Sequence, residues 1–201
     1  LFLLITMASV AEFCHIVNKK EDIHINTLIC SLAGGMLFGA FFLYNSNRTD
    51  ASIFLPYILS IIYLLVAELY LKHENPINNW AYTMMSQMYV ALPFSMLCIL
   101  GFQRDPAHLL NVEYRWIFPM SVFFFLWASD AGAYCVGSLL HTIFPAKLFQ
   151  RISPKKSWVG SICGGLIAMG VGIAIWSFDN SLTLSQWIVL GIIVTIFGTW
   201  G

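Results

Sequence analysis

Long apolar stretches, separated by short polar connectors, dominate this chain of 201 residues. Hydrophobic residues make up 59% of the sequence and charged residues only 10%, whereas ordinary soluble domains are roughly 25% charged. The mean hydropathy is +0.76. Burying this much apolar surface away from water would require an improbably large core, so lipid is the expected solvent. The composition therefore predicts an integral membrane protein whose first partner is the lipid bilayer.

A helix that crosses the hydrocarbon core of a bilayer needs about 20 predominantly apolar residues. By this criterion the hydropathy pattern predicts an all-α, polytopic transmembrane helical bundle with about seven spans. The expected spans are 1–17, 25–44, 52–71, 80–102, 116–142, 158–177 and 186–201. The fifth is long enough to tilt, break or re-enter. We expect residues 1–201 to form a single membrane domain that is truncated at both ends, because each end lies within an apolar stretch.

Lys and Arg residues set the expected orientation, because they concentrate in cytoplasmic connectors. If the connector 143–157 is cytoplasmic, alternation of the spans puts the connector around Asp179 on the other side. The cytoplasmic side then holds Lys19, Lys20, Lys72, Lys147, Arg151, Lys155 and Lys156, against Arg48, Arg104 and Arg115 outside. We therefore expect the connector that carries Lys155 and Lys156 to face the cytoplasm.

Charge and cysteine usage exclude several classes of protein. The formal net charge is +0, so no basic footprint indicates a nucleic-acid partner. The five cysteines show neither a CxxC pair nor a cysteine–histidine metal spacing, and we expect them to be small buried hydrophobic residues. The histidines lack HxxxH and HExxH spacing, and are expected to be interfacial or solvated.

The run Ser153–Trp158 lies between two membrane-length stretches and predicts the start of a helix. Ser153 suits the N-cap and Pro154 the first helical position. Lys155 and Lys156 would then lie in the first turn, where the helix dipole is already positive. Such an arrangement is unfavourable unless an anion binds there, and free backbone N–H groups with paired lysines suit a phosphate. The alternative is that both lysines are membrane anchors.

Asp130 lies deep within the apolar stretch 116–142. An ionisable group in that position costs about 2.5–3.5 kcal/mol on insertion scales, so it requires a polar cavity, a partner or a metal ion. On a helix, Asp130, Ala133, Tyr134 and Gly137 would share one face. The small residues on that face leave room for a substrate or for a neighbouring helix. We predict that Asp130 is functional.

Two further acids lie in apolar stretches. Glu68 precedes Lys72 by one helical turn, which predicts a structural ion pair near an interface. Glu12 has no cation one turn away, and its role stays open. The segment 160–165 contains a GxxxG spacing that allows close helix packing. This spacing also predicts that the helix start lies close to the helix that carries Asp130.

Taken in this order, these features resemble the phosphatidate cytidylyltransferase (CDP-diacylglycerol synthase) family. That family carries Asp-x-x-Ala-Tyr, a short connector, then Ser-Pro-Lys-Lys-Thr-Trp-Glu-Gly and a Gly-Gly pair. The matching residues are Asp130, Ala133, Tyr134, Ser153, Pro154, Lys155, Lys156, Ser157, Trp158, Gly160, Gly164 and Gly165. The resemblance is specific over residues 127–165 and elsewhere is limited to hydropathy and the number of spans.

Three departures from the family pattern matter. Ser157 replaces threonine and keeps the hydroxyl, whereas Val159 stands where the family usually has glutamate. A C-terminal segment with a Lys-Asp pair, His-Gly-Gly and Asp-Arg-x-Asp supplies the family's metal-binding aspartates, and it is not found in residues 1–201. We expect these ligands to lie beyond Gly201, so that this chain by itself is inactive.

The resemblance implies that phosphatidic acid attacks the α-phosphorus of CTP, giving CDP-diacylglycerol and pyrophosphate, with Mg²⁺ as cofactor. It implies a bacterial cytoplasmic membrane and allows a homodimer. The implied catalytic residues are Asp130, Lys155 and Lys156, with Asp130 also a metal ligand. The implied substrate-binding residues are Tyr134, Ser153, Ser157, Trp158 and Gly160.

Other functions stay open at this point. A CTP-using lipid kinase, or a cytidylyltransferase for another lipid, would share parts of the architecture, but the Ser-Pro-Lys-Lys-Ser-Trp run favours the diacylglycerol enzyme. A membrane transporter would use Asp130 as an ion or proton ligand. Transporters of that kind are typically built from inverted repeats, and the sequence shows none.

Overall fold

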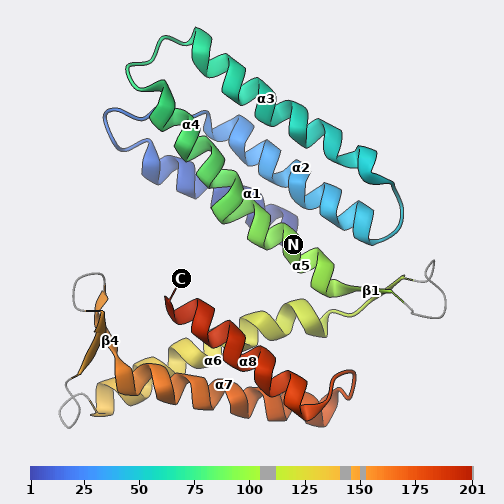
Figure 1. Cartoon of the computed structure of the whole chain (residues 1–201), viewed down its shortest axis with the longest axis vertical. Coiled ribbons are helices and arrows are strands. Elements are labelled where there is room, and N and C mark those ends of the chain that lie inside the picture. The colour runs from blue at the N-terminus through green and yellow to red at the C-terminus, as the bar shows by residue number, and fades with distance from the viewer. Residues whose placement is uncertain (105–111, 141–145, 150–152, 201) are drawn as a thin grey trace. The chain divides into compact units, whose positions relative to one another are not determined.

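The computed structural model describes residues 1–104, 112–140, 146–149 and 153–200. The chain divides into two compact units, Leu1–Trp116 and Ile117–Gly201, which are described here one at a time. Helices predominate in both units (Figure 1), as the hydropathy pattern predicts.

The first unit is a helical bundle with α2 at its centre. Its helices are α1 (Phe2–Val17), α2 (Thr27–Asn45), α3 (Leu55–Tyr70), α4 (Pro76–Met85) and α5 (Leu92–Gly101). A short 3₁₀ helix, η1 (Ala51–Phe54), precedes α3, and a π-helical turn, η2 (Ser86–Ala91), joins α4 to α5. Helix α2 packs against α1, α3 and α5. Strands β1 (Phe102–Arg104) and β2 (Val112–Tyr114) form an antiparallel pair after α5.

Local sequence explains where the helices of this unit begin. The side chain of Asn26 caps α2 by accepting a hydrogen bond from the backbone N–H of Ile29 at 3.0 Å. Helices α3 and α4 each have a proline in their first two positions, where a missing N–H costs nothing. Between the helices lies a core of buried apolar residues that includes Val10, Cys14 and Cys30. Cys14, Cys30 and Cys98 are buried, as predicted, whereas Cys163 is half-buried and Cys135 is exposed, so the prediction was wrong for Cys135.

The described part of the second unit consists of three helices and a short hairpin. Helix α6 (Ile117–Leu140) is followed by β3 (Lys147–Phe149), β4 (Ser153–Ser157), α7 (Trp158–Phe178) and α8 (Leu184–Trp200). Helix α7 packs against both α6 and α8. Its core includes Phe125, Ala168 and Trp187. Strands β3 and β4 pair antiparallel, with Lys147 opposite Ser157.

Among the described residues, five helical segments are long and apolar enough to cross a membrane: Thr27–Asn45, Ala51–Tyr70, Pro76–Gly101, Ile117–Leu140 and Trp158–Phe178. The remaining two predicted spans correspond to the shorter apolar helices Phe2–Val17 and Leu184–Thr199. The transmembrane helical bundle is thus confirmed. The long fifth span is one unbroken helix, α6. That residues 1–201 share one membrane domain stays a prediction.

Candidate functional site in the second unit

The run Ser153–Ser157 is a β-strand and not the start of a helix, so that prediction was wrong. Helix α7 begins at Trp158, and the hydroxyl of its N-cap Ser157 accepts a hydrogen bond from the Gly160 N–H at 3.1 Å. The pairing of this run with β3 explains the shift, because a partner strand keeps the run extended up to Ser157.

Lys156 therefore lies in the hairpin, two residues before the first residue of α7. Its ammonium group donates a hydrogen bond to the backbone carbonyl of Thr199 at 2.9 Å, near the C-terminal end of α8. That end of a helix carries the negative pole of its dipole, so the lysine has a favourable partner within the chain. The side chain of Lys155 lies outside the described residues.

Asp130 and Tyr134 lie on the exposed face of α6, with Tyr134 78% exposed. Ala133 and Gly137 lie instead on the face that packs against α7. The four residues span an arc of about 100° around the helix axis, so Ala133 at one edge packs against α7 while Tyr134 at the other edge is exposed. Within the described part of the chain, Asp130 makes no hydrogen bond or ion pair.

Close contacts between glycines and backbone join α6 to α7, as the GxxxG spacing predicts. A Cβ atom on Gly160 would lie 2.8 Å from the carbonyl oxygen of Ala133, and one on Gly137 would lie 3.3 Å from the Ser157 hydroxyl. Gly160, which is predicted to bind substrate, is buried against α6. In this structure, the lack of a side chain on Gly160 allows the start of α7 to pack closely against α6.

These contacts give the depth of each predicted site residue along α6. Ser157 lies at the level of Gly137, and Gly160 lies at the level of Ala133, next to Tyr134. Asp130 is one turn further from the start of α7, or about 6 Å along the axis. The described contacts do not join Asp130 to Lys156, whose ammonium group is directed to α8.

One residue of this face was missed by the sequence analysis. Ser138 is exposed and lies one turn beyond Tyr134, toward the hairpin end of α6. Asp130, Tyr134 and Ser138 therefore form a polar stripe with i, i+4, i+8 spacing. Extending the i, i+4 spacing by one more turn from Tyr134 would have identified Ser138. The polar stripe connects the middle of α6 with the end where Ser157 caps α7.

The described residues do not by themselves form a metal centre. Among them there is no group of three or more His, Cys, Asp or Glu side chains that could hold a metal ion. The acids of the second unit are Asp130 and Asp179, and Asp179 follows the far end of α7. Mg²⁺ is bound by one or two carboxylates together with phosphates and water, so Asp130 can contribute one ligand.

A polar cluster in the first unit corrects two other predictions. Glu68 is buried, and one carboxylate oxygen lies 2.9 Å from His73 Nδ1 and 2.6 Å from Asn79 Nδ2. The expected Glu68–Lys72 pair is not formed, because α3 ends at Tyr70 and Lys72 takes a left-handed backbone conformation with a φ of 52°. His73 is thus paired and half-buried, where the sequence predicted a solvated or interfacial histidine.

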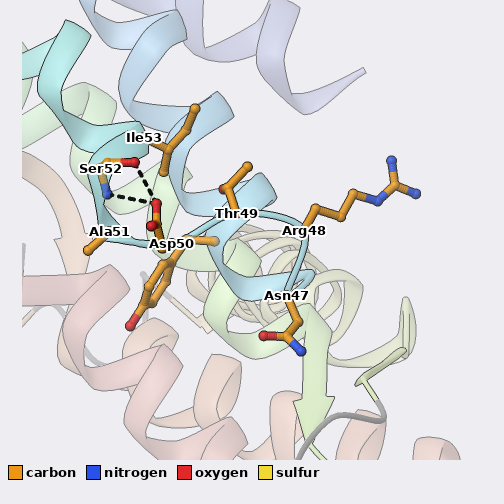
Figure 2. A pocket seen from close by; sticks show the side chains of 8 residues that line it. Asn47, Arg48, Thr49, Asp50, Ala51, Ser52 and Ile53 are labelled. Carbon is orange, nitrogen blue, oxygen red and sulfur yellow. Dashed lines mark hydrogen bonds between the residues drawn. The ribbon is translucent and has the colours of Figure 1, made fainter.

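A hollow of about 790 Å³ lies over the connector between α2 and α3 and is lined by Tyr44 and by residues 47–53 (Figure 2). The Asp50 carboxylate accepts hydrogen bonds from the hydroxyl and the backbone N–H of Ser52, which hold the pKa of Asp50 below its usual value. Arg48 points away from Asp50. Because the carboxylate is already used to cap η1, this hollow is not the candidate site.

The apolar helices define an integral membrane protein, and α6 carries a polar stripe on its exposed face. The model of the cytidylyltransferase family matches residues 1–201, so the chain belongs to that family. The phosphatidate cytidylyltransferase of Haemophilus influenzae is 30% identical over 98 residues, which are 49% of this chain and 31% of that relative. The matched region thus spans about a third of the relative's length. No solved structure matches the chain.

Proposed function

We propose that the protein is a phosphatidate cytidylyltransferase, which transfers CMP from CTP to phosphatidic acid. A phosphate oxygen of the lipid forms a bond to the α-phosphorus of CTP, and the bond from that phosphorus to pyrophosphate breaks. Family membership and the named relative support this proposal. The observation that carries it is the polar stripe of α6, which leads from a carboxylate at membrane depth to a lysine-bearing hairpin.

The hairpin end of the polar stripe suits the phosphates of both substrates. CTP is soluble in water and carries several phosphates, so it would bind where Lys155 and Lys156 supply positive charge. Phosphoryl transfer depends mostly on positioning and on neutralising charge, which fits lysines at this end. Ser157 keeps its O–H as a donor while its oxygen accepts from Gly160. Ser153, Trp158 and Tyr134 would complete the binding surface.

Asp130 would serve as one ligand of Mg²⁺. When bound, Mg²⁺ would neutralise charge on the phosphates. Because the described residues provide a single carboxylate at this depth, the metal needs ligands from elsewhere in the protein. The proposal places the hairpin on the cytoplasmic side of a bacterial cytoplasmic membrane, where CTP is available. A homodimer stays a prediction.

A purified full-length protein tests the proposal. It would be supplied with CTP labelled at the α-phosphorus, Mg²⁺ and phosphatidic acid. Formation of labelled CDP-diacylglycerol together with pyrophosphate is the expected result. Parallel reactions with diacylglycerol and with an ether-linked phosphatidic acid separate the alternatives. Transfer of the γ-phosphate to diacylglycerol would identify a lipid kinase, and preference for the ether lipid would identify a cytidylyltransferase of another lipid class.

A further inference from the structure

A groove of about 330 Å³ runs between α7 and α8, on the side of α7 away from the polar stripe. Its floor consists of small side chains: Ser161 and Gly165 from α7 and Thr195 from α8. A Cβ atom on Gly165 would meet only the Thr195 methyl group, at 3.8 Å. The rim is apolar and exposed, with Ile162 60% and Ile196 51% exposed. The groove thus forms where small residues of α7 and α8 face each other between large, exposed apolar side chains.

We propose that this groove binds one acyl chain of phosphatidic acid, with the lipid phosphate at the hairpin end. This inference rests on the proposed function, because it assigns a place to the lipid substrate of that reaction. The polar floor, the length of the groove and the charge at its end each support an anionic lipid as the occupant.

The floor contains a hydroxyl group without a partner. Thr195 is only 6% exposed, and its Oγ1 makes no hydrogen bond within the described chain. A buried unsatisfied hydroxyl is destabilising, so this group is positioned to donate to something absent from the chain. Thr195 lies one turn, about 6 Å, deeper than Thr199 at the hairpin end of α8. An acyl ester carbonyl lies just below a lipid phosphate, and it accepts a hydrogen bond without donating one.

The length of the groove distinguishes a lipid chain from another helix. Its lining on α7 runs from Trp158 to Met169, which is about 16 Å along the helix axis. That distance is about half of the roughly 30 Å hydrocarbon core, which is the depth of one leaflet. A packed transmembrane helix would follow α7 through both leaflets, whereas an acyl chain enters from one leaflet and ends near the midplane.

Positive charge lies at the hairpin end of the groove. Lys156 Nζ is hydrogen-bonded to the carbonyl of Thr199, a residue that lines the groove. Strand β3 contributes Leu148 to the lining, and its neighbour Lys147 is exposed. The described acids of the second unit lie elsewhere, Asp130 on α6 and Asp179 after the far end of α7. The charge at this end therefore complements an anionic phosphate.

Two glycine variants of the full-length protein test the groove. Gly165→Leu fills the floor, whereas Gly170→Leu adds the same side chain to the same helix at an exposed position with nothing within 4 Å. In lipid nanodiscs, Gly165→Leu should raise the KM for phosphatidic acid roughly tenfold or more. The KM for CTP should stay unchanged, and Gly170→Leu should match the wild type. An unchanged KM for phosphatidic acid in Gly165→Leu would overturn the proposal.

Thr195→Val removes the hydroxyl and keeps the shape of the side chain. We expect the KM for phosphatidic acid to rise on the order of three- to tenfold, the range of one lost hydrogen bond. Thermal stability should be unchanged or higher, because an unsatisfied buried group is removed. Lower stability with an unchanged KM would show that the hydroxyl serves the fold and would refute its role in lipid binding.

Photocrosslinking tests the groove without relying on turnover. Phosphatidic acid with a diazirine in its acyl chain should label peptides that contain residues 158–169, and unlabelled phosphatidic acid should compete. Equal competition by phosphatidylcholine would indicate bulk lipid and overturn the assignment. If the wild type forms no CDP-diacylglycerol but is labelled in the groove, the proposed reaction fails and the lipid site stands. If it is active but unlabelled there, the groove proposal alone fails.

Discussion

Gly164 of α7 lies directly against the backbone of Ser129 of α6. A Cβ atom on Gly164 would be only 2.5 Å from the Ser129 carbonyl oxygen, closer than two such atoms can approach. Since Asp130 follows Ser129 in the chain, this contact also fixes the depth of Asp130 relative to the start of α7. The packing of two helices and the geometry of the candidate site therefore depend on the same glycine.

Replacing Gly164 should separate these helices. We expect Gly164→Ala to lower the free energy of unfolding by about 1–3 kcal/mol, the range for overpacking a close contact. Gly170→Ala is the matched control, because an added Cβ there has nothing within 4 Å. It should be neutral or gain up to about 1 kcal/mol from helix propensity. Thermal unfolding in detergent measures both variants, and equal stability of the two would contradict the packing role.

The sequence predicts this interface better than it predicts the hairpin beside it. The small residues at positions 160 and 164 fall one helical turn apart, so their effect is local and visible in the spacing. The start of α7 depends instead on the pairing of β3 with β4, a local hairpin that the residue pattern did not predict. Ser153 and Ser157 are equally good N-cap residues by type. Pairing with the partner strand β3 makes Ser157 the N-cap, and the residue spacing does not reveal that pairing.

The lysine pair should be needed for turnover of CTP. We expect Lys155→Ala combined with Lys156→Ala to lower kcat/KM for CTP by about 10²–10³, as when a group that stabilises phosphate charge is lost. Lys19→Ala is the control, because it removes an exposed lysine from the side predicted to be cytoplasmic. The bond from Lys156 to Thr199 predicts a small stability loss, about 0.3–1 kcal/mol. A double variant with normal kinetics would reduce both lysines to membrane anchors.

Asp130→Asn should lower kcat by a factor on the order of 10² or more. Because Asp130 is exposed and makes no hydrogen bond or ion pair within the described chain, the variant should fold as stably as the wild type. Ala131→Asn changes polarity on the neighbouring exposed position without removing a charge, and should keep its activity. Rates would be measured across a magnesium titration. Full activity of Asp130→Asn at every magnesium concentration would show that the carboxylate is not required.

Asn79 should be essential to the polar cluster around Glu68. It is 1% exposed, donates to the Glu68 carboxylate at 2.6 Å and accepts from the His24 backbone N–H at 2.9 Å. Asn79→Ala leaves these groups without a partner, so we expect a loss of about 1–3 kcal/mol of stability. Asn78→Ala, at the exposed neighbouring position, should have little effect. Chemical unfolding of the purified protein compares the two, and equal stability would contradict a structural role for the cluster.

The cluster shows why the site around Glu68 was not predicted. Glu68 and Lys72 have the spacing of a helix pair, but α3 ends before Lys72 is reached. The actual partners, His73 and Asn79, lie beyond that end, and Asn79 belongs to α4. Their approach depends on the packing of α4 against α3, which the sequence pattern does not reveal. Asp130, by contrast, could be proposed as a candidate from the sequence, because a charge in an apolar stretch is conspicuous without any knowledge of its neighbours.

Accessibility at the two ends of α7 tests the orientation on which the proposed function depends. Lys147 in the hairpin and Asn180 after α7 are both exposed, so each can carry a single cysteine in a cysteine-free background. Asn180 is preferred to Asp179, whose carboxylate accepts a hydrogen bond from the Ser181 N–H at 2.8 Å.

CTP can reach the lysines only if the hairpin is cytoplasmic. An impermeant thiol reagent should therefore label Lys147→Cys from the cytoplasmic face and Asn180→Cys from the opposite face. Because α7 is long enough to cross the membrane, labelling of both positions from one face would show that α7 does not span it. Reversed labelling would place the lysine-bearing hairpin away from CTP and exclude the proposed reaction.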